Sequence, residues 1–238
     1  MYRIVYSILL VISVGIISFT SNTSYRYGTI PTLQISYHLI SKNFNLNTDD
    51  TLLLIKLNNE LNNAFSNICQ FKIYSIDTIQ SSSTLWKLYK NYTTSAGDIL
   101  TALKNIYQVN NTINIYIYFN GTVETDYYLL GFTSLRVLSE MDNILDFNYS
   151  DAIFVSKNAL LLYADAHTLI HEMGHFFGLK HPFSAEMTRE ELSAMGLTDI
   201  NVLCTNYMNY NCYTDNWTLQ QRLYMKKYIM SYRSYLFK

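Results

Sequence analysis

Four of the five histidines in the chain lie in one stretch, residues 167–181, which reads HTLIHEMGHFFGLKH. If this stretch begins as a helix, His171 and His175 are one turn apart and project from the same face, where their imidazoles can bind one ion. Glu172 follows the first of them and stays outside the ligand pair, so its carboxylate can reach a water beside that ion. The stretch therefore predicts a metal site on a helix.

A third ligand is expected from the residues just beyond this helix. Gly178 follows His175 by three residues and can adopt a positive φ, which ends the helix and turns the chain back. That turn brings His181 within reach of the ion. Three protein ligands leave one position open for water, as in hydrolytic zinc sites, whereas a structural site is closed by four. We expect one catalytic Zn²⁺ on His171, His175 and His181, with His167 outside the ligand set.

Composition points to one folded domain and excludes a broad class of partners. The chain has 238 residues, of which 49% are hydrophobic and 15% charged, enough for a substantial core. The formal net charge is −1, and no run of Lys or Arg forms a basic patch, so a nucleic-acid partner is not expected. The chain has no internal repeat and no Pro-rich linker.

Hydrophobic periodicity predicts an α+β fold, with a mixed sheet of about five strands that carries helices. The expected strands are 30–40, 71–79, 112–119, 127–135 and 151–156. The expected helices are 47–68, 95–108, 166–177, 188–197 and 218–232. Four of them have candidate caps, which are Asp49 or Asp50, Asp98, Asp165 and Thr218; Thr188, with Glu191 three residues later, forms a capping box for the helix at 188–197.

The N-terminal residues resemble a secretory signal. Arg3 precedes an apolar run over residues 4–19, which is short for a membrane span. We therefore expect a signal peptide over 1–22 and a secreted or extracytoplasmic protein. The alternative is that residues 4–19 remain as a membrane anchor, and only then would the membrane be a partner.

The three cysteines allow one local disulfide. Cys204 and Cys212 are close enough in sequence to bridge a loop, which leaves Cys69 as a buried free thiol.

Beyond the histidines, the chain resembles the metzincin clan of zinc endopeptidases, whose second hallmark is a turn that contains Met. CTNYMNYNC, residues 204–212, supplies such a turn with Met208. The segment NYMNYNCYTDNWTLQQRLYM, residues 206–225, is similar to the pappalysin branch, with Trp217, Thr218 and Gln221 in matching positions. The order of the upstream elements is similar as well.

This resemblance implies a site, a fold and an activity. Zinc would lie on the three histidines, with Glu172 as general base, Met208 beneath the metal and Tyr210 beside it to stabilise the oxyanion. Leu130, Gly131 and Phe132 would belong to the edge strand that binds extended substrate. Residues 28–238 would form a single catalytic domain, with an upper lobe to about 178 and a small irregular lower lobe over 179–238. Residues 182–204 depart from the family pattern, and the sequence does not support a structural Ca²⁺.

The resulting hypothesis is a secreted, monomeric zinc endopeptidase that acts on proteins or peptides through a zinc-activated water, with Glu172 as general base. The alternative is a catalytically silent zinc protein that binds peptides or host molecules on the same scaffold. The intact Glu172 argues against this alternative, because a binding module has no need of a base.

Overall fold

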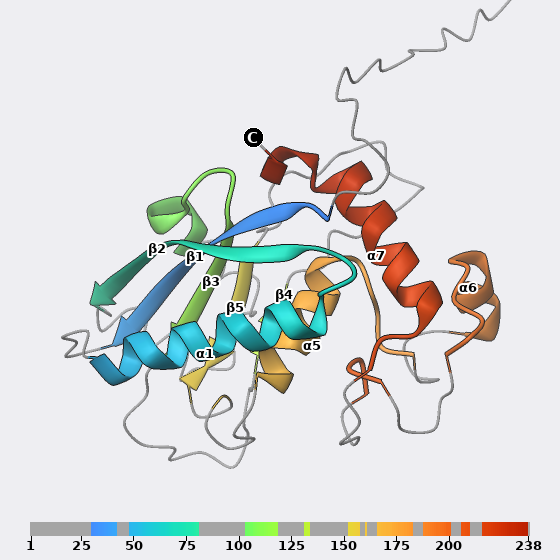
Figure 1. Ribbon diagram of the computed structural model, residues 1–238, viewed down its shortest axis with the longest axis horizontal. Coiled ribbons are helices and arrows are strands. Elements are labelled where there is room, and N and C mark those ends of the chain that lie inside the picture. The colour runs from blue at the N-terminus through green and yellow to red at the C-terminus, as the bar shows by residue number, and fades with distance from the viewer. Residues whose placement is uncertain are drawn as a thin grey trace, which may run out of the picture.

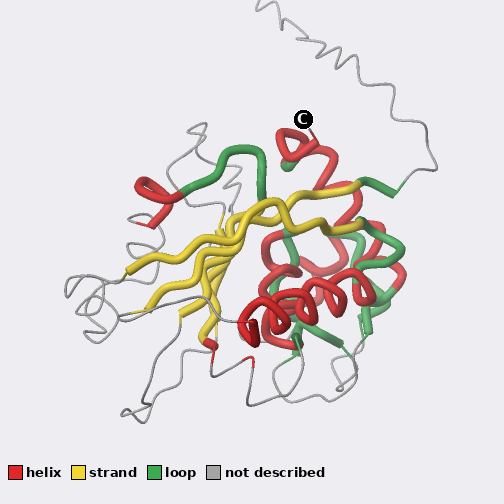
Figure 2. Tube along the Cα trace, turned by 60° about the vertical axis from the view of Figure 1, so that its left-hand side comes forward, coloured by secondary structure: helices red, strands yellow, loops and turns green. Residues whose placement is uncertain are grey.

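The computed structural model describes residues 30–41, 48–80, 103–118, 131–133, 152–157, 160, 166–182, 188–200, 206–209 and 216–237. Figure 1 shows a twisted sheet with helices beside it, and Figure 2 shows most of the helical residues gathered on one side of that sheet. The expected signal segment 1–22 lies outside these residues. None of the helices in the described ranges is long and apolar enough to span a membrane.

The described strands form one mixed sheet of five strands in the order β2-β1-β3-β5-β4. They are β1 (Thr32–Ser41), β2 (Gln70–Gln80), β3 (Ile113–Tyr118), β4 (Gly131–Thr133) and β5 (Ala152–Ser156). The first three and β5 run parallel, and β4 pairs antiparallel with β5 at the edge. The expected five-stranded mixed sheet is confirmed. Only residues 131–133 of the strand expected at 127–135 are described.

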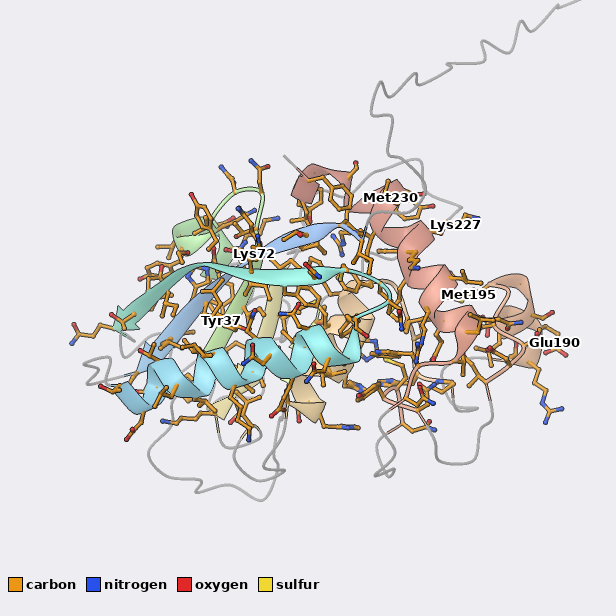
Figure 3. All side chains as sticks on the ribbon, in the orientation of Figure 1. Tyr37, Lys72, Glu190, Met195, Lys227 and Met230 are labelled. Atoms are coloured by element: carbon orange, nitrogen blue, oxygen red, sulfur yellow. The ribbon has the colours of Figure 1, made fainter. Side chains whose placement is uncertain are left out.

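One face of the sheet is covered by α1 (Thr48–Ala64) and α5 (His167–Phe176). Leu54, Leu57 and Leu61 recur at helical spacing on α1 and are buried against alternate residues of β1. Tyr37 belongs to that β1 face, and Figure 3 shows it between the sheet and α1. Each fully buried leucine contributes about 1.5–3 kcal/mol relative to an exposed one, so this face holds α1 in place.

The opposite face of the sheet has a smaller apolar cluster and a buried polar network. Leu103, which begins the described part of the expected 95–108 helix, packs there with Tyr116 and Phe154. His38, the histidine outside the 167–181 stretch, is fully buried there. Its Nδ1 atom lies 2.7 Å from Asp77 Oδ1, and its Nε2 atom 2.9 Å from Asn114 Oδ1. This histidine therefore joins β1 to both of its neighbouring strands.

The start of α5 is capped differently from the sequence prediction. Asp165 was expected as the N-cap, but the cap position is Ala166, which has no side-chain oxygen to accept a hydrogen bond. Glu60 of α1 binds the cap residue itself, since its Oε2 atom accepts from the Ala166 backbone N–H at 2.6 Å. The start of α5 is therefore bonded to a carboxylate from a distant helix.

After Gly178 the chain forms α6 (Arg189–Ala194) and α7 (Leu219–Tyr232), which lie to one side of the sheet in Figure 1. Both begin with a complete capping box, Thr188 with Glu191 and Thr218 with Gln221, so both predicted starts are confirmed. In Figure 3, Glu190 points away from the body of the protein.

A short 3₁₀ helix, η1 (Ser234–Phe237), follows α7 and was not predicted. Just before it, the fully buried Arg233 donates to the Phe176 carbonyl oxygen through Nε (3.3 Å) and Nη2 (3.2 Å). The guanidinium also lies over the Phe176 ring, 4.2 Å from its centroid. The C-terminal end of the chain is thus fastened to the last turn of α5.

Candidate metal centre

The three predicted ligands come together as one buried group. His171 and His175 lie one turn apart on α5, and His181 follows the bend after the helix. The Nε2 atom of His181 is 3.0 Å from His171 Nε2 and 3.0 Å from His175 Nε2. Their candidate ligand atoms all lie within 4.8 Å of one another. The group can therefore hold a metal ion.

The other ring nitrogens show that this arrangement suits a cation. His171 Nδ1 donates to the Tyr207 carbonyl oxygen, and His175 Nδ1 donates to the Leu179 carbonyl oxygen, both at 2.7 Å. Since a carbonyl only accepts, both Nδ1 atoms carry the proton, and in the neutral rings both Nε2 atoms present lone pairs. His181 Nε2 can donate to only one of them. In at least one of the two 3.0 Å contacts, a lone pair on one Nε2 atom therefore faces a lone pair on the other. A metal ion bound between the rings would remove that repulsion.

The electrostatics also favour a neutral His171. Burial and, after it, the neighbouring His175 lower its pKa to about 3, against the raising effect of the hydrogen bond to the Tyr207 carbonyl, and His181 and His167 contribute to the lowering. His171 is consequently neutral at physiological pH, which is the form that binds metals.

The bend that supplies His181 depends on Gly178. Its φ is +88°, a conformation that residues with a Cβ rarely adopt, which confirms the predicted end of the helix. The Leu179 N–H donates to the Gly174 carbonyl oxygen at 3.0 Å, in the manner of a helix C-cap. Leu179 is also the residue whose carbonyl orients His175. The same turn therefore ends the helix, orients one ligand and leads to the next.

Glu172, which follows His171 on α5, is buried and contacts the edge strand. Only 6% of the residue is exposed. Burial raises its pKa to about 7, and a hydrogen bond from the Thr133 hydroxyl opposes part of that rise. The Thr133 Oγ1 atom lies 2.9 Å from Glu172 Oε2 and 3.0 Å from the Glu172 backbone oxygen. A carboxyl with a pKa near neutrality is suited to take up and release a proton.

The turn at residues 206–209 lies directly against α5. Met208 is fully buried, and its Sδ atom lies 2.7 Å from where a Cβ on Gly174 would be. Trp217 approaches the same position to 2.8 Å, so Gly174 permits the close contact. Tyr207 of this turn holds His171 through its carbonyl oxygen. The turn therefore packs against Gly174 of the helix and positions one of the two helical ligands.

A buried amide pair fastens this turn to α7. Asn206 Nδ2 donates to Gln221 Oε1 at 2.5 Å, and Gln221 Nε2 donates to Asn206 Oδ1 at 3.0 Å. Asn206 Oδ1 also accepts from the Met208 N–H, and Gln221 Oε1 from the Thr218 N–H, both at 3.0 Å. Gln221 thus belongs at once to the cap of α7 and to the support of the turn.

Several expected site residues lie outside the described ranges, namely Tyr210, Leu130, Cys204 and Cys212. Phe132 is described only in its backbone, as part of β4. His167 is not in the metal group, and its ring packs on Tyr207 with centroids 5.6 Å apart. Cys69 is buried and free, as expected.

Sequence reasoning missed three contributors to the site. The Thr133 hydroxyl and the Tyr207 carbonyl had no local signal, because each acts on a residue far along the chain. Gly174 did have a local signal. A glycine inside a helix costs about 1 kcal/mol relative to alanine, so its presence there indicates that another part of the chain packs closely against that position.

A cavity of about 440 Å³ lies apart from the three histidines. It opens between the ends of α1, α5 and α7 and is lined by residues that include Glu60, His167 and Arg222. It shares Tyr207 with the metal centre, but none of the three ligands lines it.

Comparison with known proteins adds no relative. No protein-family model matches the chain, and no curated protein matches it. The histidine group and its surroundings are therefore the basis for any functional conclusion.

Proposed function

We propose that this chain is a zinc endopeptidase of the metzincin type, similar to the pappalysin branch. The observation that carries the proposal is the convergence of the His171, His175 and His181 Nε2 atoms, with the buried Glu172 following the first ligand on the same helix. Three imidazoles are the ligand set of a zinc site that keeps one position open.

Different residues of the chain would carry out different parts of the reaction. The three histidines would hold the ion, which supplies Lewis-acid activation of a water and of the substrate carbonyl when bound. Glu172 takes the proton of the attacking water and delivers it to the leaving amine. The Tyr207 and Leu179 carbonyls keep two ligands in one tautomer throughout.

The burial of Glu172 supports hydrolysis over passive binding. Desolvation makes this carboxyl costly to ionise, and its described hydrogen-bond partner is Thr133. A scaffold that only binds peptides gains nothing from this cost, whereas a pKa near neutrality suits a group that takes up and releases a proton. Buried groups with strongly shifted pKa values are common at catalytic sites.

The same proposal implies a substrate, a location for the protein and a division into two lobes. The substrate would be a protein or peptide, aligned along the edge strand that includes Gly131. The chain would act as a secreted monomer, with residues 1–22 as its export signal, and its cleft would separate an upper lobe from the lower lobe after Gly178.

The experiment is cleavage of a peptide library by the zinc-loaded wild type and by Glu172→Ala. We expect cleavage by the wild type and a loss of at least 100-fold in Glu172→Ala at unchanged zinc content. Equal cleavage by both proteins, or none by a wild type that holds zinc, would contradict the proposal. Metal analysis of His181→Ala tests the third ligand separately, with weaker zinc retention expected.

A further inference from the structure

Two residues of β4 contact Glu172 from the same face of the strand. β4 pairs antiparallel with β5, with Gly131 opposite Val155 and Thr133 opposite Ile153. Because side chains alternate along a strand, positions 131 and 133 face the same way. Both lie against Glu172 of α5.

Positions 131 and 133 make different contacts with the two carboxylate oxygens of Glu172. The Thr133 hydroxyl lies 2.9 Å from Oε2. At position 131 a Cβ would lie 3.1 Å from Oε1 and 3.0 Å from Cγ of Glu172, so glycine leaves room there. No donor within the described ranges contacts Oε1. One oxygen is therefore bonded to the strand, and the other lies against Gly131, where the lack of a side chain gives it room.

The Thr133 hydroxyl is also anchored to the helix. It lies 3.0 Å from the backbone oxygen of Glu172, so its single proton is shared between two oxygens of the same residue. This double contact ties the end of the side chain to its own backbone. Glu172 is thus restricted to one position by a residue from another element.

We propose that Thr133 is a positioning residue of the endopeptidase proposed above, on which this inference rests. It keeps Oε2 as a hydrogen-bond acceptor and leaves Oε1 as the oxygen that exchanges the proton. The oxygen of the attacking water bonds to the carbonyl carbon, whose π electron pair moves to the carbonyl oxygen, while one O–H bond of the water breaks and its proton goes to Oε1. The same proton then passes to the amine nitrogen as the C=O bond re-forms and the C–N bond breaks, which restores the Glu172 carboxylate. Oε2 accepts from Thr133 throughout, since an uncharged carboxyl oxygen still accepts.

The test compares Thr133→Val with Thr133→Ser in the zinc-loaded full-length protein. Valine has the shape and strand preference of threonine but no hydroxyl, whereas serine keeps the hydroxyl. We expect Thr133→Val to bind zinc like the wild type and to lose about 10- to 100-fold in kcat, with KM within about twofold. Thr133→Ser is expected to recover kcat to within about threefold of the wild type.

Crystal structures of the same variants give a readout besides activity. The Glu172 carboxylate is expected to leave its position in Thr133→Val and to keep it in Thr133→Ser. A carboxylate that stays in place in Thr133→Val, or a wild-type kcat in that variant, would overturn the inference. A wild type that cleaves no peptide would refute the proposed function instead, and the position of the carboxylate would still decide the role of Thr133.

Discussion

His171 donates from Nδ1 to the carbonyl oxygen of Tyr207 over 2.7 Å, and this bond joins the metal centre to the turn that follows α6. The turn is fastened in its own right to α7, through the reciprocal amide pair of Asn206 and Gln221. Residues 30 or more positions beyond the end of the helix therefore orient a ligand on it. Groups that orient a ligand in this way commonly change metal affinity 10- to 100-fold when they are replaced.

Gln221→Met should weaken zinc binding by about 10-fold. Methionine fills a similar volume but leaves the buried Asn206 amide without its partner, so Tyr207 is free to shift away from His171. Zinc affinity can be measured by competition with a chromophoric chelator. Thr218→Ala is the matched control: it removes the hydroxyl that caps α7 at Gln221 N (3.1 Å) but keeps the amide pair. We expect that control to lose about 1 kcal/mol of stability and to keep its zinc affinity. Equal loss of affinity in both variants would refute the link.

Gly178→Ala should lower the free energy of unfolding by about 2–5 kcal/mol. The backbone there has φ +88°, and the new Cβ would lie 2.5 Å from the Tyr228 ring, so conformational strain and overpacking act together. Urea unfolding measures the loss. Gly196→Ala separates the two effects, because φ is +72° there but no atom lies within 4 Å of the new Cβ. That variant should lose only about 1–2 kcal/mol.

Gly174→Ala should lower stability by about 1–3 kcal/mol, since its Cβ would meet Met208 Sδ at 2.7 Å and Trp217 at 2.8 Å. If the Met208 side chain is the group that moves to make room for the new Cβ, the effects of substitutions at 174 and 208 are coupled. The loss on Gly174→Ala should then be smaller in a Met208→Ala background than in the wild type. Chemical unfolding of the four proteins in this cycle provides the coupling, and strictly additive losses would show that Met208 does not carry the contact.

In the metal-free protein, Glu172→Gln should become increasingly stabilising as the pH rises. Burial raises the pKa of Glu172 from 4.5 to about 7, so between these values the folded state keeps a proton that the unfolded state has lost. The cost to the wild type is absent below about pH 4.5 and complete above about pH 7, and glutamine removes it. The advantage of the variant should grow by about 1–3 kcal/mol between pH 4.5 and pH 8.

Denaturant unfolding at several pH values checks this dependence. The lowered pKa of His171 acts in the opposite direction, since stability falls as the pH drops below 6.5, but His171 is present in both proteins and cancels. The exposed Glu190→Gln serves as a control for replacing a surface carboxylate and should change the free energy of unfolding by no more than about 0.5 kcal/mol. A flat difference for Glu172→Gln would mean that its carboxyl is not desolvated.

The features that sequence predicted correctly are those that depend on neighbours a few residues away. The capping boxes at Thr188 and Thr218, the amphipathic face of α1 and the bend at Gly178 are all of this kind. The convergence of the three histidines follows from helical spacing plus that one bend. A short motif was sufficient here because it determines its own geometry.

The features that sequence missed depend on pairs that are distant along the chain. Glu60 of α1 bonds the Ala166 N–H at the start of α5, Thr133 bonds Glu172 from the sheet edge, and Arg233 fastens the C-terminal end to Phe176. Each contact requires the tertiary arrangement to exist first, so no local pattern could indicate it. The strand order β2-β1-β3-β5-β4 has the same origin.

The dependence of cleavage on zinc tests the central claim most directly. Zinc is removed from the wild type with a chelator and returned in steps, while cleavage of a denatured protein is followed. We predict no cleavage without zinc, and a rate that rises and levels off at one ion per chain. Cleavage that persists in the chelator, or a protein that binds one ion at His171, His175 and His181 and still cleaves nothing, would contradict the account.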